Sequence, residues 1–243
     1  MRIPPVKLAL ASALLGLSLF GCTDVDSTNL KTSGIRAELT VTGRGDGSAY
    51  ASAGLYVSDS TLTFVELQEG DSLTATTGDQ SKDLTKSELL GLISYGATFS
   101  DADAEGTTYS IAFNRDSDES ATGNTASLPA KFNLTAPVGD ALSYSRANDD
   151  IVITYDNSGK ADEMSYSLDG DCLNVYGQVL DGDPGTITLP KGTLTLKDTT
   201  TSPTSCQVTL TVSRTREGTL DPAFAEGHMA GVQSRSFTFS SMP

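Results

Sequence analysis

Cys206-Gln-Val-Thr-Leu-Thr-Val212 alternates polar and apolar residues. Such period-two alternation predicts a strand that buries one face, here carrying Val208, Leu210 and Val212. The same pattern recurs in residues 35–41, 60–67, 107–113, 150–155 and 235–239. Turn sequences such as Gly-Asp, Asn-Ser-Gly and Pro-Lys-Gly separate these runs. The sequence therefore predicts an all-β fold.

The spacing of these strands and turns is typical of β-sandwiches, and we expect two tandem Ig-like sandwich domains. The stretch 115–127 contains almost no large apolar residue and is interpreted as a linker. It would separate a first domain, residues 34–114, from a second, residues 128–243. The chain has no Trp, so Ig-like describes only the architecture and not the core Trp of immunoglobulins.

One segment breaks the β pattern. Leu84, Leu89, Leu90 and Ile93 have helical spacing, and Thr85-Lys-Ser-Glu88 fits a capping box. We therefore expect one short helix near residues 85–94, covering an edge or open end of a sheet.

The N-terminus has the features of an export signal. Arg2 and Lys7 precede an apolar run over residues 8–20, which is too short to span a bilayer. Leu19-Phe20-Gly21-Cys22 then resembles the lipobox of bacterial lipoproteins. The resemblance implies a signal peptide at residues 1–21 and fatty acylation, including palmitate, on Cys22. A polar, flexible tether over residues 22–33 would follow, and Thr23 in place of Asp after the Cys favours the outer membrane.

The mature chain is strongly acidic. Removing residues 1–21 leaves 14 basic against 31 acidic residues, a net charge of −17. Nucleic acids and anionic lipid headgroups require clustered basic residues, so we expect no nucleic-acid partner.

The cysteine count predicts a disulfide. With Cys22 acylated, Cys172 and Cys206 remain as an even pair, and an exported protein folds in an oxidising compartment. Both lie next to predicted strands, so the bond would join two strands or two sheets.

One acidic loop partly matches a metal-binding motif. Asp101-Ala-Asp-Ala-Glu105-Gly106 matches the first half of an EF-hand loop, but Ala112 replaces the final bidentate Glu. Calcium is the one cofactor that these acidic loops suggest, with candidate ligands in two loops: Asp101, Asp103, Glu105, Asp181 and Asp183. His228 is the single histidine and no serine lies in a GxSxG motif, so no catalytic residue is predicted.

Three segments carry a further resemblance. Residues 145–155, 164–172 and 214–224 are similar to a group of uncharacterised proteobacterial envelope lipoproteins with a C-terminal Ig-like domain, for which the family implies no function. We expect a membrane-anchored, non-enzymatic binding or structural module that contacts an envelope protein or polysaccharide through loops or an edge strand. The alternative is an unrecognised hydrolase that works through carboxylates, assisted by calcium.

Overall fold

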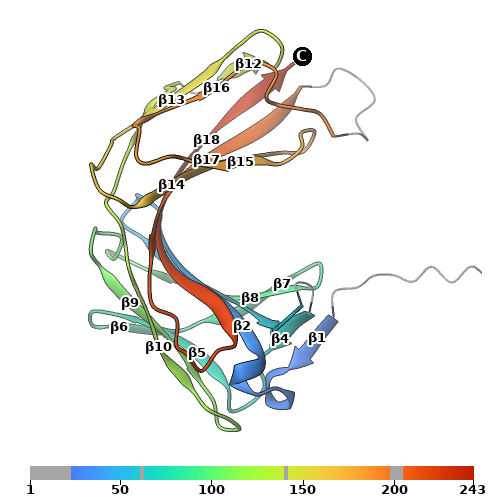
Figure 1. Cartoon of the computed structure of the whole chain (residues 1–243), viewed down its shortest axis with the longest axis vertical. Helices are drawn as coiled ribbons and strands as arrows, with labels where there is room; N and C mark the ends of the chain where they lie inside the picture. The colour runs from blue at the N-terminus through green and yellow to red at the C-terminus, as the bar shows by residue number, and fades with distance from the viewer. Residues whose placement is uncertain (1–22, 61–62, 140–141, 198–204) are drawn as a thin grey trace, which may run out of the picture.

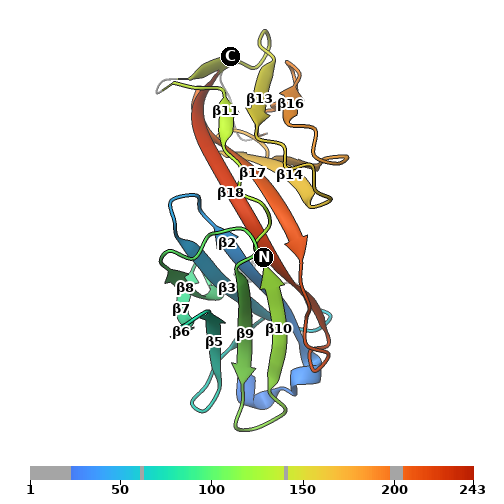
Figure 2. The ribbon, with the colours of Figure 1, turned by 90° about the vertical axis from the view of Figure 1, so that its left-hand side faces the viewer.

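The computed structural model describes residues 23–60, 63–139, 142–197 and 205–243. Its secondary structure consists of strands β1 to β18 and two single-turn 3-10 helices, η1 and η2. The strands build two β-sandwiches, one above the other in Figures 1 and 2. The predicted all-β sandwich class is confirmed.

The first sandwich packs two layers around one core. One layer contains β1 (Thr23–Asp26), β4 (Thr63–Glu66), β3 (Ala49–Val57), β2 (Ile35–Gly43), β8 (Leu92–Phe99) and β7 (Thr85–Leu89). The other contains β10 (Ala121–Ser127), β9 (Thr108–Asn114), β5 (Ser72–Thr77) and β6 (Gln80–Asp83). Strict alternation of buried and half-buried residues along β2 explains its single core face.

The second sandwich repeats this arrangement with shorter strands. One layer contains β14 (Glu163–Gly170), β15 (Tyr176–Val179) and β12 (Ser143–Ser145), and the other contains β11 (Leu134–Ala136), β13 (Ile151–Tyr155) and β16 (Thr186–Leu189). Between the layers lies a separate core that includes Ile153 of β13, Phe132 from the segment before β11, and Leu210.

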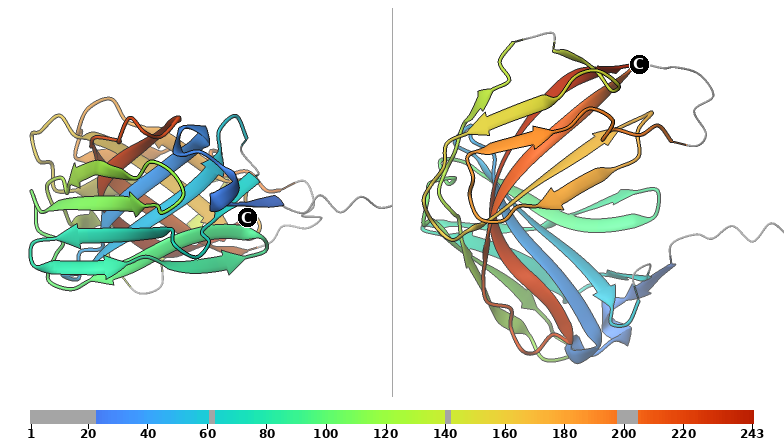
Figure 3. Two further views of the ribbon diagram at one scale, coloured as in Figure 1. Left: turned by 90° about the horizontal axis from the view of Figure 1, so that it is seen from below. Right: turned by 45° about the horizontal axis from the view of Figure 1, so that its top comes forward.

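A long hairpin belongs to both sandwiches. It consists of β17 (Cys206–Glu217) and β18 (Glu226–Met242), and Figure 3 shows β18 running through the whole molecule. Residues 226–233 pair in parallel with β2, whereas residues 240–242 pair in parallel with β12. Met229 therefore enters the first core and Phe239 the second. Gly231 is required where β18 passes β10, because a Cβ there would lie 2.2 Å from the Ser127 carbonyl oxygen.

The helix predicted near residues 85–94 is wrong, because the segment forms the β7–β8 hairpin. Leu90 and Gly91 both have positive φ, 52° and 80°, which is the geometry of a tight two-residue hairpin turn. Leu84 and Ile93 are buried as the pattern requires, but Leu89 and Leu90 point to solvent.

The linker predicted at residues 115–127 is also wrong, because β10 occupies Ala121–Ser127 and pairs with β9. Its buried positions hold small or polar residues, so it lacks the apolar signal of a strand. Asn124 is fully buried and donates to the carbonyl oxygens of Ile111 (2.7 Å) and Ala121 (3.0 Å). The first core also includes Phe224 and Met229, which the sequence placed in the second domain.

The flexible tether predicted over residues 22–33 is not found in its described part. β1 begins at Thr23 and pairs in parallel with β4, and η1 (Ser27–Asn29) and η2 (Thr32–Gly34) follow. The buried guanidinium of Arg115 donates to the carbonyl oxygens of Ser27 (2.6 Å) and Leu30 (3.0 Å) and to Thr32 Oγ1 (3.0 Å). These contacts fix the segment onto the first sandwich.

The predicted disulfide is confirmed. Cys172 and Cys206 are bonded, with Cα atoms 6.0 Å apart. Cys172 follows β14 and Cys206 begins β17, so the bond joins neighbouring strands of one sheet.

Replacing Cys172 and Cys206 by Ala should lower the free energy of unfolding by about 3 to 4 kcal/mol, because the bond closes a 34-residue separation in the unfolded chain. Urea denaturation followed by circular dichroism measures this change. Cys22→Ser serves as the control and should leave the urea midpoint unchanged. If the midpoint of the double variant were also unchanged, the stabilisation assigned to the disulfide would be contradicted.

Candidate functional site

Three buried polar residues, Asp103, Arg214 and Gln233, lie where the hairpin passes from one sandwich to the other. Arg214 on β17 is fully buried, and its Nη2 lies 2.8 Å from Asp183 Oδ2. The same guanidinium donates to the carbonyl oxygens of Ala130 (2.9 Å) and Asp156 (3.0 Å). Its Cζ lies 5.0 Å from the centre of the Phe132 ring. Arg214 thus holds the segment that connects the sandwiches.

Asp103 forms the second part of this cluster. Its carboxylate accepts from Lys131 Nζ (2.5 Å) and the Gly47 N–H (3.1 Å), and its carbonyl oxygen accepts from Gln233 Nε2 (2.8 Å). Burial raises the pKa of Asp103, but these donors outweigh burial and hold the pKa below its ordinary value. We call Asp103, Lys131, Asp183, Arg214 and Gln233 the junction cluster.

Two further ion pairs lie beside the junction cluster. Lys160 of the second sandwich pairs with Glu105 of the first. Arg216 pairs in a bidentate manner with Asp162, at 2.7 and 2.8 Å. The junction is therefore held by charge pairs and hydrogen bonds as well as by the shared strands.

The calcium candidates are divided between this junction and the surface. Asp103, Glu105 and Asp183 each face a cationic side chain, which satisfies the charge that a metal would neutralise. Asp101 and Asp181 are exposed. Within residues 23–243, outside the undescribed gaps, no group of three or more His, Cys, Asp or Glu could hold a metal ion. Calcium binding stays a prediction.

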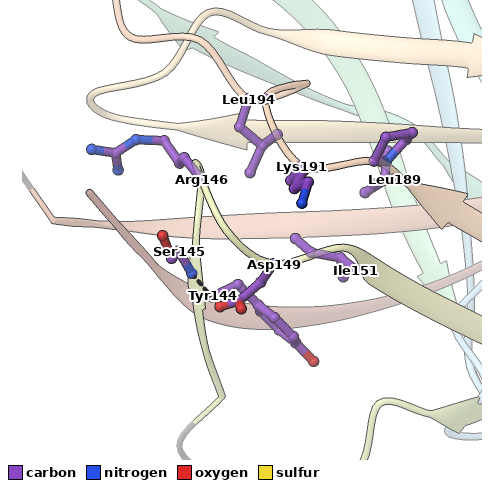
Figure 4. Close-up of a pocket in the computed structure, with 10 residues that line it drawn as sticks. Tyr144, Ser145, Arg146, Asp149, Ile151, Leu189, Lys191 and Leu194 are labelled. Atoms are coloured by element: carbon purple, nitrogen blue, oxygen red, sulfur yellow. Dashed lines mark hydrogen bonds between the residues drawn. The ribbon is translucent and has the colours of Figure 1, made fainter.

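A small pocket opens in the second sandwich between the end of β12 and the loop after β16 (Figure 4). Tyr144, Ile151 and Leu194 line its apolar part, and Arg146 and Asp149 its polar part. Its volume of about 10 Å³ is enough for roughly one water molecule. A pocket of this size is far smaller than the sites that bind small organic ligands.

His228 lies on β18, and its Nδ1 is 2.5 Å from Glu38 Oε2 on the neighbouring strand β2. The contact is a cross-strand pair at a half-exposed position. Cys22, the predicted acylation site, lies outside the described residues. In the part of the chain that the structure describes, no helix is long and apolar enough to cross a bilayer. The carboxylate hydrolase stays a prediction.

No family model and no curated protein matches the chain. Among solved structures it is similar to titin A168169, with a TM-score of 0.26 and 12% identity over 86% of this chain and 98% of that chain. It is also similar to the Yersinia pseudotuberculosis adhesin InvE, with a TM-score of 0.23 and 13% identity over 86% and 60% of the chains. It is similar as well to the chicken CNTN1 FN1-FN3 domains, with a TM-score of 0.20 and 12% identity over 86% of this chain and 65% of that chain. With TM-scores this low, no family or function follows from these similarities.

Arg214→Met should lower the free energy of unfolding by about 3 to 5 kcal/mol, because it leaves the Asp183 carboxylate buried without its cation. Urea denaturation measures the loss. Adding Asp183→Leu to Arg214→Met should recover part of it. Arg216→Met removes a more exposed pair on the same strand and should cost on the order of 1 kcal/mol. Equal losses for Arg214→Met and Arg216→Met would contradict the role given to Arg214.

The stability contributed by Asp103 should depend on pH. Because its folded pKa lies below the ordinary 3.8, this contribution is present above the ordinary pKa and is lost as pH falls through the folded pKa. In Lys131→Met, the same burial without the ion pair should raise the pKa of Asp103. A ¹³C NMR titration of the carboxyl carbon measures both values. An unchanged pKa of Asp103 in the variant would show that Lys131 does not stabilise the Asp103 carboxylate.

Proposed function

We propose that this chain is a cell-envelope protein anchored by lipid to the outer membrane. Its body would be a stiff, non-enzymatic binding module. One observation carries the proposal: β18 supplies residues to both cores and passes through the junction cluster. A pair of domains on a flexible linker can rotate freely, whereas two sandwiches that share a hairpin cannot. The second sandwich is therefore held at a fixed position relative to the first.

The length of the shared strand β18 determines how far the second sandwich can lie from the anchored end. β18 contains 17 residues, and at about 3.3 Å per residue it spans roughly 55 Å. A lipid on Cys22 would attach to the first sandwich, since Cys22 directly precedes β1. The module would then carry its second sandwich away from the point of attachment.

The surface offered for binding is the outer strand of the second sandwich. β15 is the last strand of its sheet in the described residues, and it pairs with β14 on one side. Val175, directly before β15, is 71% exposed, and Val179, its last residue, is 57% exposed. Strand edges of this kind accept an extended segment of a protein partner through backbone hydrogen bonds.

Crosslinking of the tagged, acylated protein in intact cells, read by mass spectrometry, tests the proposal. We expect a stoichiometric envelope partner whose crosslinks map to the second sandwich. The double variant Val175→Lys, Val179→Lys should lose that partner, because the added charges oppose docking at β15. Lysines at Val152 and Thr188, on the second sandwich but away from β15, provide the matched control.

Cys22→Ser tests the anchor separately. It should move the protein from the membrane to the soluble fraction while the body stays folded. Membrane retention of this variant would overturn the anchor. Absence of any partner for the anchored protein would overturn the binding module.

A further inference from the structure

An apolar hairpin tip stands out on the first sandwich. The turn between β7 and β8 consists of Leu89-Leu90-Gly91-Leu92, in which the three leucines are 70%, 90% and 50% exposed. Lone exposed leucines are common on protein surfaces, but three at the tip of one hairpin form a patch that usually has a binding role.

The backbone of this turn adds an independent observation. Leu90 has a φ of 52°, in the left-handed region. Turns of this kind favour Asn, Asp or Gly, since a bulky side chain at positive φ is strained. The apolar side chain at the most exposed position thus opposes both solvation and backbone preference. Strain of this sort is typical of positions kept for function.

Strand register places this tip at the same end of the sheet as the start of β1. Thr23 pairs with Thr63 on β4, and Phe64, the next residue, pairs with Tyr56, so β1 begins near the C-terminal end of β3. β8 is antiparallel to β3, and its pairing ends at Tyr95 opposite Ala53. The hairpin continues from there toward the same end of β3. In Figure 1, β1 and the hairpin turn lie on the same side of the first sandwich.

Two acidic side chains beside the tip share one cation. Lys86 Nζ lies 2.6 Å from Glu66 Oε1 and 3.0 Å from Glu88 Oε2, so one lysine faces both acids. The four turn residues carry no charge. An acidic body repels anionic headgroups, but an uncharged apolar tip can enter a zwitterionic interface.

We propose that the β7–β8 tip inserts into the lipid surface to which Cys22 is anchored. This inference rests on the proposed lipid anchor, because Cys22 immediately precedes Thr23 and brings lipid to this end of the sheet. An acyl chain alone fixes one point, whereas the leucine tip supplies a second. Two contacts fix the orientation of the first sandwich, and through the shared hairpin that of the second.

The absence of Trp from the chain makes a direct test practical. Leu90→Trp and Leu92→Trp each introduce a single tryptophan at the tip, and Val152→Trp introduces one on the second sandwich, where Val152 is 46% exposed. The acylated proteins are reconstituted in zwitterionic phosphatidylcholine vesicles with or without brominated acyl chains. We expect blue-shifted emission and bromine quenching for the two tip variants, and neither for Val152→Trp.

Each other outcome overturns the inference. Tip emission that matches the soluble Cys22→Ser form, despite a mass that shows acylation, rejects insertion and leaves the anchor intact. Quenching of all three variants shows that the body lies on the membrane without preference for the tip. A concentration-dependent blue shift in the Cys22→Ser form, without vesicles, shows that a second copy covers the tip. A mass without acyl chains rejects the proposed anchor, and the inference with it.

Discussion

Parallel pairing between residues 226–233 of β18 and residues 36–43 of β2 joins the end of the chain to a strand near its beginning. The first core is closed by the same C-terminal segment: Phe224 stacks on Phe113 with ring centres 5.9 Å apart, and Met229 is buried. The first sandwich therefore cannot complete its core from residues 23–128 alone. Its folding depends on the hairpin that also builds the second sandwich, so the two should unfold as coupled units.

The position of polar residues along this hairpin explains why the sandwiches stay distinct. Arg214 on β17 pairs directly with Gln233 on β18, and both are fully buried, whereas Met229 and Phe239 on either side are apolar. An apolar residue in place of Arg214 or Gln233 would fit many packings. A buried guanidinium has few satisfying arrangements, and in the part of the chain described here Arg214 Nε and Asp183 Oδ1 still lack a hydrogen bond. Such a network specifies one arrangement of the two strands, and its unsatisfied polar atoms lower the stability of the fold.

The sequence predicts those features that depend on local periodicity. Alternation in residues 35–41, 107–113 and 206–212 identifies β2, β9 and β17, because each buries one face. Prediction from periodicity fails where the buried residues do not follow the apolar pattern of the sequence. β10 buries Asn124 and Ala126 instead of large apolar residues, so its sequence resembles a linker. The leucines of residues 84–93 have helical spacing, but Leu89 and Leu90 are exposed, so this spacing does not mark a buried face.

The junction cluster could not be predicted for a different reason. Asp103 and Lys131 are 28 residues apart, and Asp183 and Arg214 are 31 apart, so no local spacing connects them. An acidic loop has the same composition whether it binds calcium or an arginine from another strand. Only the three-dimensional fold shows that the carboxylates of Asp103 and Asp183 pair with cations of this chain.

Hydrogen-bonded strands run without interruption from β1 through β4, β3, β2, β18, β17 and β14 to β15. The segment between β1 and β2 is held by Arg115, which contacts Ser27, Leu30 and Thr32. A displacement or rotation imposed at Thr23 is thus carried by backbone hydrogen bonds across both sandwiches to Val179. A flexible tether would lose that orientation within a few residues, because each free residue adds independent backbone rotations. The start of β1 at Thr23 therefore matters as much as the shared hairpin, because together they tie the orientation of the second sandwich to Thr23.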